Sequence, residues 1–130
     1  MTEQTELVLS KWEYTPPQSA IADEEKIVST LSLNVMKKRA PTKKGIACRF
    51  GCRFVFENEP ILEYVAEDSY VIDFEDVIDS NELLNMIMNS YSKFAEKFDF
   101  RKLGTVLQNR SITSLDRNSI DVEPILPLLK

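Results

Sequence analysis

The most regular pattern in the chain is an alternation of apolar and other side chains between residues 45 and 57. Successive side chains of a β-strand point to opposite faces of the sheet, so this alternation predicts a strand with one buried face. The apolar parity holds Ile46, Cys48, Phe50, Cys52, Phe54 and Phe56. The basic segment 37–45 precedes this strand and Asn58-Glu59-Pro60 follows it, and both segments are typical of turns.

Two similar strands are predicted on either side of it. Residues 26–38 form one, in which Ile27, Leu31, Leu33 and Val35 share a parity. Residues 61–74 form the other, in which the even-numbered residues are apolar apart from Asp68. Short links can join antiparallel strands but not parallel ones, so these three strands are predicted to form an antiparallel meander.

A first strand is predicted over residues 7–14. It ends before Pro16-Pro17, because proline cannot donate to a strand ladder. Its apolar residues lie on both parities, with Val8, Trp12 and Tyr14 on one and Leu7 and Leu9 on the other, which leaves its buried face undecided. Residues 1–6 are polar, and we expect them to be disordered.

After these strands the apolar residues recur at the spacing of a helix instead of alternating. A helix is therefore predicted over residues 81–102. Its apolar stripe at helical spacing holds Leu84, Ile87, Met88, Tyr91, Ala95 and Phe98. Asp79 is the expected N-cap, with Glu82 three positions later, and Gly104 is the expected stop. The tail from residue 120 is expected to pack as a short turn of helix. The predicted fold class is therefore α+β.

Composition and charge narrow the function. The 130 residues suit a single domain, and the net charge of −5 disfavours a nucleic-acid partner. The chain has no histidine, which removes the commonest general base and every histidine-containing metal site. No apolar run approaches the roughly 20 residues that a membrane-spanning helix needs. We therefore predict a cytoplasmic protein that is not an enzyme, with no cofactor, no metal and no insertion into a membrane.

Cys48 and Cys52 are the only cysteines. Four residues of strand span roughly 13 Å, which exceeds the roughly 7 Å limit for a disulfide. Both cysteines share a parity with phenylalanines. They are predicted to be reduced, buried core residues, and a redox or metal pair is the less favoured interpretation.

Two charged clusters have an ordinary and a functional interpretation. The basic cluster is interpreted as a solvated turn, and a site for a phosphate or an acidic partner is the alternative. This cluster contains Lys37, Lys38, Arg39, Lys43, Lys44, Arg49 and Arg53. The acidic cluster is interpreted as a solvated surface. A basic protein partner is the main alternative, and a cation site is a weaker one. This cluster contains Glu67, Asp68, Asp73, Glu75, Asp76, Asp79 and Glu82.

Apolar side chains exceed what one sheet face and one helix stripe can bury. The excess predicts a homo-oligomer, dimer or tetramer, or an adaptable groove for polypeptides, because aromatic and methionine side chains repack around different sequences. The candidate groove residues are Trp12, Phe54, Met86, Met88 and Phe94.

The order of these elements resembles that of the SecB-like export chaperones. Residues 7–17, LVLSKWEYTPP, are similar to the family's first strand as it enters its crossover loop. Residues 31–35, 48–56 and 62–72 are similar to its alternating strands, and residues 83–98 to its main helix. The resemblance implies a SecB-like single domain over residues 1–130, with a four-stranded antiparallel sheet covered by one long helix and a short C-terminal helix.

The resemblance also implies a function. Members of this family are cytoplasmic, ATP-independent holdases that assemble as dimers of dimers and keep client polypeptides unfolded in long apolar grooves. Protein export is one such duty, and chaperoning an antitoxin is another. The alternative is a non-enzymatic regulatory or structural protein of the same fold that binds one specific protein partner. An enzyme is the least favoured class, because its chemistry would rest on carboxylates, Tyr or Lys alone.

Overall fold

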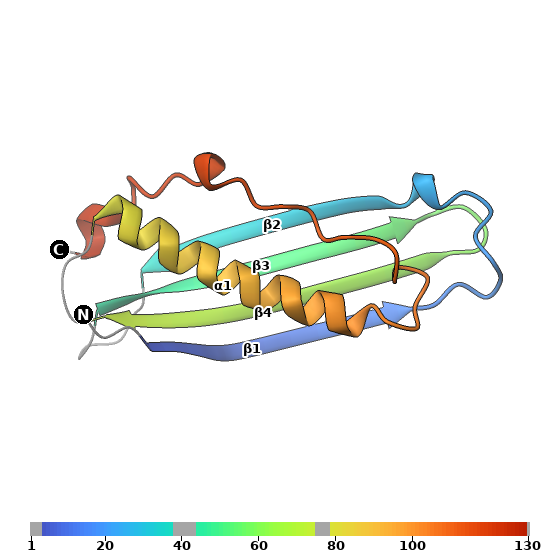
Figure 1. The fold of residues 1–130 in the computed structure, drawn as a ribbon, viewed down its shortest axis with the longest axis horizontal. Coiled ribbons are helices and arrows are strands. Elements are labelled where there is room, and N and C mark those ends of the chain that lie inside the picture. The colour runs from blue at the N-terminus through green and yellow to red at the C-terminus, as the bar shows by residue number, and fades with distance from the viewer. Residues whose placement is uncertain (1–3, 38–43, 75–78, 130) are drawn as a thin grey trace.

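The computed structural model describes residues 4–37, 44–74 and 79–129 (Figure 1). Four strands form one antiparallel sheet: β1 (Gln4–Thr15), β2 (Val28–Lys37), β3 (Lys44–Phe56) and β4 (Leu62–Phe74). Their order across the sheet is β1-β4-β3-β2. The predicted meander of the last three strands is confirmed. The link from β1 to β2 carries a short 3-10 helix, η1 (Glu24–Lys26), and passes from one edge of the sheet to the other.

Strand β1 begins earlier than predicted. Gln4, Thr5 and Glu6 pair with residues 73, 72 and 71 of β4, so the expected disorder is wrong for residues 4–6. The polar side chains of these residues gave no sign of the pairing, because the hydrogen bonds of a strand ladder are made by the backbone. Residues 1–3 lie outside the described residues. The pairing register shifts between Leu7 and Leu9, so the chain reverses its parity there, and Leu7 lies on the same face as Trp12 and Tyr14.

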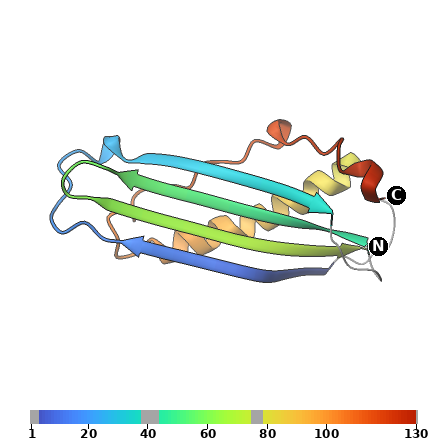
Figure 2. The same ribbon diagram turned by 180° about the vertical axis from the view of Figure 1, so that it is seen from behind.

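One face of the sheet carries the core and the helix α1 (Ser80–Arg101), as predicted. In Figure 1 this helix crosses the sheet obliquely, and Figure 2 shows that the opposite face has no element over it. Aromatic rings join the two layers. The Phe54 and Phe98 rings stack with centroids 5.1 Å apart, and those of Phe50 and Phe94 stack at 5.9 Å. The phenylalanine parity of β3 therefore faces the helix, as the alternation predicted.

The two ends of α1 follow from its sequence. The side chain of Asp79 accepts a hydrogen bond from the backbone N–H of Glu82 at 2.8 Å, which confirms the predicted N-cap. Gly104, just beyond the helix, has a φ of +80°, which a residue with a Cβ adopts only at a cost. The chain turns there and runs back over the sheet.

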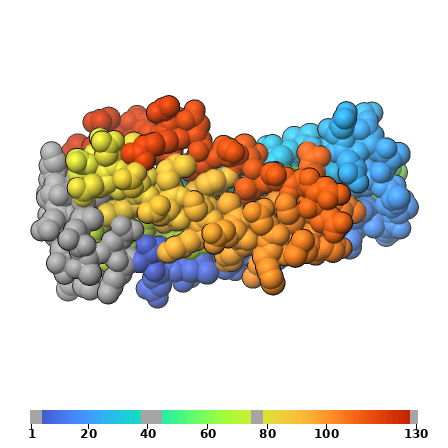
Figure 3. Space-filling view, viewed as in Figure 1, coloured from blue at the N-terminus to red at the C-terminus, as the bar shows by residue number. Residues whose placement is uncertain are grey.

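Residues 105–125, which we call the strap, follow this turn. They contain a short 3-10 helix, η2 (Arg117–Ser119), and lead to a second one, η3 (Leu126–Leu129), where a short turn of helix was predicted. Figure 3 shows the strap, in orange to red, lying alongside α1 on the covered face. Among the described residues, no helix is long and apolar enough to cross a membrane.

Candidate functional site

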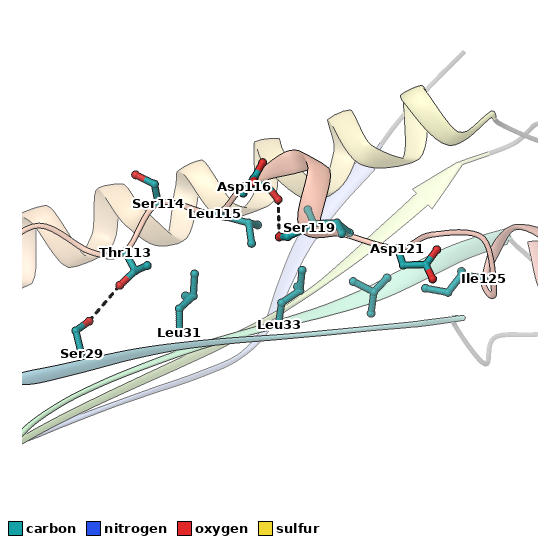
Figure 4. Close-up of a pocket in the computed structure, with 12 residues that line it drawn as sticks. Ser29, Leu31, Leu33, Thr113, Ser114, Leu115, Asp116, Ser119, Asp121 and Ile125 are labelled. Atoms are coloured by element: carbon teal, nitrogen blue, oxygen red, sulfur yellow. Dashed lines mark hydrogen bonds between the residues drawn. The ribbon is translucent and has the colours of Figure 1, made fainter.

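A groove lies between strand β2 and the strap (Figure 4). Its volume is about 520 Å³. One wall is the core-facing side of β2, with Leu31, Leu33 and Val35, all half-buried. The other wall consists of strap residues: Thr113, Ser114, Leu115, Asp116, Ser119, Ile120, Asp121 and Ile125. The groove therefore presents apolar side chains from two segments that are far apart in the sequence.

The groove exists because α1 does not cover the whole sheet. The helix packs on β3 and β4, and β2 lies at the edge of the sheet. The odd-numbered residues of β2 pair with core residues of β3, such as Leu33 with Phe50, so they face the covered side. The strap lies above them but is mostly polar, and its side chains bury them only in part. An apolar strip is left partly open.

Arg110 attaches the first part of the strap to the segment that precedes β2. Its guanidinium group donates hydrogen bonds to the backbone carbonyls of Glu24 and Ile27, at 2.8 and 3.1 Å. Its own backbone carbonyl accepts a hydrogen bond from Lys102 Nζ at 2.6 Å. One residue thus joins the strap, the loop before β2 and the end of α1.

Two further residues, Thr113 and Arg117, hold the strap over the groove. The backbone carbonyl of Thr113 accepts a hydrogen bond from the hydroxyl of Tyr91. The side-chain Oγ1 of Thr113 lies 3.2 Å from Oγ of Ser29 on β2. Farther along, Arg117 of η2 donates to the side chain of Asn85 and to the backbone carbonyl of Asn81, both on α1. The strap is anchored to α1 and to one end of β2.

The groove also contains polar side chains. Hydroxyls and two carboxylates, those of Asp116 and Asp121, stand among its apolar side chains. Asp116 Oδ1 accepts from the backbone of Asn118, and Asp121 Oδ1 from that of Glu123, so both carboxylates help to shape the strap. Over the described ranges no cluster of metal-ligating side chains is found. The arrangement suits an apolar chain segment held by side-chain contacts.

The residues predicted for a groove lie elsewhere. Phe54, Met86 and Phe94 are buried between sheet and helix, at 0%, 2% and 0% exposure. Trp12 and Met88 are half-buried and therefore retain accessible surface. None of the five lines the groove beside β2. In the single chain the first three are core residues, and a client could reach them only if α1 left the sheet.

Trp12 belongs to a polar network around Asp68. Asp68 is fully buried on β4, and its carboxylate accepts hydrogen bonds from four groups on β1, β4 and α1. These are Ser10 Oγ at 2.7 Å, Trp12 Nε1 at 2.8 Å, Tyr70 Oη at 2.9 Å and Lys97 Nζ at 2.8 Å. The interpretation of Asp68 as part of a solvated acidic surface is therefore wrong.

The network determines the charge of Asp68. Burial by itself raises the pKa of this carboxyl, but the hydrogen bonds from Lys97, Ser10, Trp12 and Tyr70 outweigh it and hold the pKa below its usual value. Burial and the neighbouring carboxylate raise the pKa of the Tyr70 hydroxyl. Asp68 is thus ionised and Tyr70 protonated at neutral pH, the states in which all four donors are used.

The cysteines are free and buried, as predicted. Burial raises the pKa of each thiol to about 12, with a smaller contribution from Asp68 at Cys52. A thiolate is the reactive form, so neither cysteine is poised for chemistry at neutral pH.

Two arginines of the basic cluster form ion pairs with residues of β4. On the open face of the sheet, Arg53 contacts Glu63 at 2.7 Å and Arg49 contacts Glu67 at 3.3 Å, so each of these two arginines has a carboxylate partner. Residues 38–43 of the basic cluster, and Glu75 and Asp76 of the acidic one, lie outside the described residues.

Comparisons with known proteins identify the fold. No family model and no curated protein matches the chain in sequence. Its structure is similar to the SecB-like chaperone Rv1957 of Mycobacterium tuberculosis, solved in complex with a ChAD peptide from the Rv1956 HigA1 antitoxin. The TM-score is 0.51 and the identity 13%, over 87% of this chain and 90% of that chain. The chain has the SecB-like fold.

The order of elements in the sequence predicted a SecB-like fold, and that prediction is confirmed. A protein of unknown function from Streptococcus agalactiae is similar more loosely, with a TM-score of 0.37 and 10% identity over 89% of this chain and 99% of that one. Within the SecB-like fold described here, the groove beside β2 was not predicted. The one signal for it was the pair of isolated apolar residues in the polar stretch, Leu115 and Ile120.

Proposed function

We propose that this protein is an ATP-independent chaperone that binds polypeptide segments in the groove between β2 and the strap. The observation that carries the proposal is the exposed part of that groove, where Leu31, Leu33 and Val35 face Leu115 and Ile120 across an open space. A well-packed domain would close such a strip unless another chain covered it. The SecB-like neighbour was solved with a bound antitoxin peptide, which supports a polypeptide as the occupant.

The groove favours a holdase over an enzyme. Its contacts are apolar and spread along a strand, which allows different client sequences to bind because they share apolar side chains but no common shape. The chain also has no histidine to serve as a general base. Free buried thiols fit a reducing compartment such as the cytoplasm, where we place its action.

Self-association is part of the proposal. Strand β1 is the other edge of the sheet, and its side chains at Leu7, Val8 and Leu9 are 43%, 53% and 45% exposed. Phe100 on α1, 77% exposed, lines the same hollow as Leu7. An exposed apolar edge strand is an aggregation hazard unless it is covered. We propose that a second copy of the chain covers it.

Aggregation suppression tests the proposed function. Several unrelated reduced, unfolded clients are diluted into buffer with the wild-type protein, without ATP, and light scattering is followed. A holdase lowers the scattering of most clients at stoichiometric amounts. The alternative, a protein that serves one specific partner, predicts suppression for none or only one of them.

A further inference from the structure

A second hollow lies on the face of the sheet opposite α1, where β2 begins and β3 ends (Figure 2). Its volume is about 360 Å³, near the small end of the roughly 300–1,000 Å³ that ligand pockets occupy. None of its lining residues belongs to the groove beside β2, so an occupant here is separate from the proposed client. The lining includes Lys26, Val28 and Thr30 on one side and Arg53, Val55 and Glu57 on the other.

The floor of this hollow is apolar. Val28 and Val55 lie directly opposite each other in the ladder between β2 and β3. The next pair, Ser29 and Phe54, faces the covered side, where the Phe54 ring stacks on α1, so the two valines face the open side. The solvent-facing side of an antiparallel sheet normally carries polar residues, yet Val28 is 62% exposed. The valine pair therefore offers an apolar surface to a small molecule.

Two cations line the hollow. Lys26 comes from η1, before β2, and Arg53 comes from β3. Arg53 donates to Glu63 at 2.7 Å and keeps further N–H groups for another acceptor. Within residues 4–37, 44–74 and 79–129, no ion pair involves Lys26. Glu57 adds one carboxylate, so the lining is net positive in a chain whose net charge is −5.

Lys26 stands on a turn that the rest of the molecule holds in place. Its backbone N–H donates to the carbonyl of Asp23 at 3.2 Å, and the side chain of Asp23 caps the same turn. The carbonyls of Glu24 and Ile27, on either side of this turn, accept hydrogen bonds from Arg110 at 2.8 and 3.1 Å. Ile27 is buried in the core, at 3% exposure. A ligand at Lys26 therefore binds without first ordering the backbone, a cost that weakens binding to flexible segments.

We propose that this hollow binds a small aliphatic carboxylate. The carboxylate group pairs with Lys26, and the aliphatic chain lies over Val28 and Val55. Arg53 adds positive potential, whereas a cationic ligand would meet like charge from both cations. A neutral apolar molecule lacks the ion pair, and a small inorganic anion leaves the valines uncovered, so the two features together select a ligand that has both parts. This assignment does not depend on the chaperone function proposed above.

Two-dimensional NMR of the full-length protein tests the site, with sodium hexanoate as the probe. Hexanoate is expected to shift the amide signals of residues 26–30 and 53–58 in a saturable way. Acetate carries the charge without the chain and is expected to bind about tenfold more weakly, because it covers less of the valine pair. Hexanol carries the chain without the charge and is expected to bind about fivefold more weakly. Sodium chloride at the same ionic strength serves as the blank.

Two lysine variants test the position of the charge. Lys26→Gln removes the proposed partner of the carboxylate and is expected to weaken hexanoate binding about fivefold. The matched control is Lys11→Gln, which changes an exposed lysine of β1 on the same face of the sheet. This control is expected to bind hexanoate as wild type does.

Saturable shifts around Lys26 that Lys26→Gln weakens support the site. Shifts confined to residues 31–35 and 113–121 would place hexanoate in the groove beside β2 and overturn the assignment. The same conclusion follows from the absence of saturable shifts, from equal affinities for hexanoate, acetate and hexanol, or from wild-type binding by Lys26→Gln. The proposed chaperone function is judged separately by the aggregation of clients, since the two sites share no residue.

Discussion

Lys97 Nζ on α1 lies 2.8 Å from the carboxylate of Asp68, a residue of β4 with no exposed surface. The same ammonium group lies 3.0 Å from Ser10 Oγ on β1. This ion pair therefore ties the helix to both strands at one edge of the sheet, while Trp12, on β1, donates to the same carboxylate. The helix is fixed over β1 and β4 by charge, and over β3 by aromatic packing.

Replacing Lys97 by Met leaves the buried carboxylate of Asp68 without its cation. Losing one partner of a buried pair costs about 3 kcal/mol of unfolding free energy, since the remaining charge stays desolvated. Urea unfolding followed by circular dichroism measures the change. The control is Lys11→Met, which removes a surface ion pair with Glu13 at 3.7 Å and is expected to cost less than about 1 kcal/mol. Equal effects of the two substitutions would contradict a structural role for the network.

The depressed pKa of Asp68 predicts how stability depends on pH. In the unfolded chain an aspartate titrates near pH 4, as a rough reference. The folded pKa is lower, so this group contributes stability above about pH 4 and that contribution is lost as the pH falls toward the folded value. Unfolding free energies measured between neutral and acidic pH should therefore fall less steeply for Asp68→Asn than for wild type. Parallel curves would show that Asp68 is not the group responsible.

Free-thiol titration checks the burial of the two cysteines. Each thiol has its pKa raised to about 12 by burial, so almost no thiolate is present at pH 8. Cys48 and Cys52 are expected to react slowly with a thiol reagent in native buffer and quickly in denaturant. A native protein with no titratable thiol after unfolding would instead contain a disulfide, and rapid reaction of the native protein would show that these side chains are accessible.

Light scattering coupled to size exclusion tests self-association. We expect a mass that is a multiple of 15.0 kDa, consistent with a dimer or a tetramer, because the apolar edge at β1 and Phe100 requires a cover. Phe100→Glu places a charge on this surface and should shift the protein toward the monomer. The matched control is Val28→Glu, which adds the same charge to an exposed residue of the other edge strand. A wild-type monomer at micromolar concentration would contradict the prediction.

Local patterns in the sequence predicted most of the fold. The alternation around Phe50 and Phe54 depends on neighbours two residues apart, and the Asp79 cap on a residue three positions later, so both are visible in a short window. Asp68 could not be placed in this way. Its partners Ser10 and Lys97 lie 58 and 29 positions away, and only the fold brings them together.

The groove was missed for a similar physical reason. Leu31 and Leu33 were correctly placed on the apolar parity of a strand, but whether they are covered depends on how far α1 extends across the sheet. That coverage is a property of packing and not of either segment. The strap residues Leu115 and Ile120 are isolated in a polar stretch, where no periodicity marks them.

The central claim is that the groove beside β2 binds polypeptide. Fluorescence anisotropy of a labelled, reduced and unfolded client measures this directly with two variants of β2. Leu33→Asp places a charge in the groove, whereas Asn34→Asp adds the same charge to the next residue, which is exposed on the opposite face of the strand. Circular dichroism first verifies that both variants are folded.

The account predicts that Leu33→Asp weakens client binding about tenfold or more, because it desolvates a charge against apolar side chains, while Asn34→Asp binds as wild type does. Equal, wild-type binding by both folded variants would contradict the claim and place the client elsewhere on the molecule.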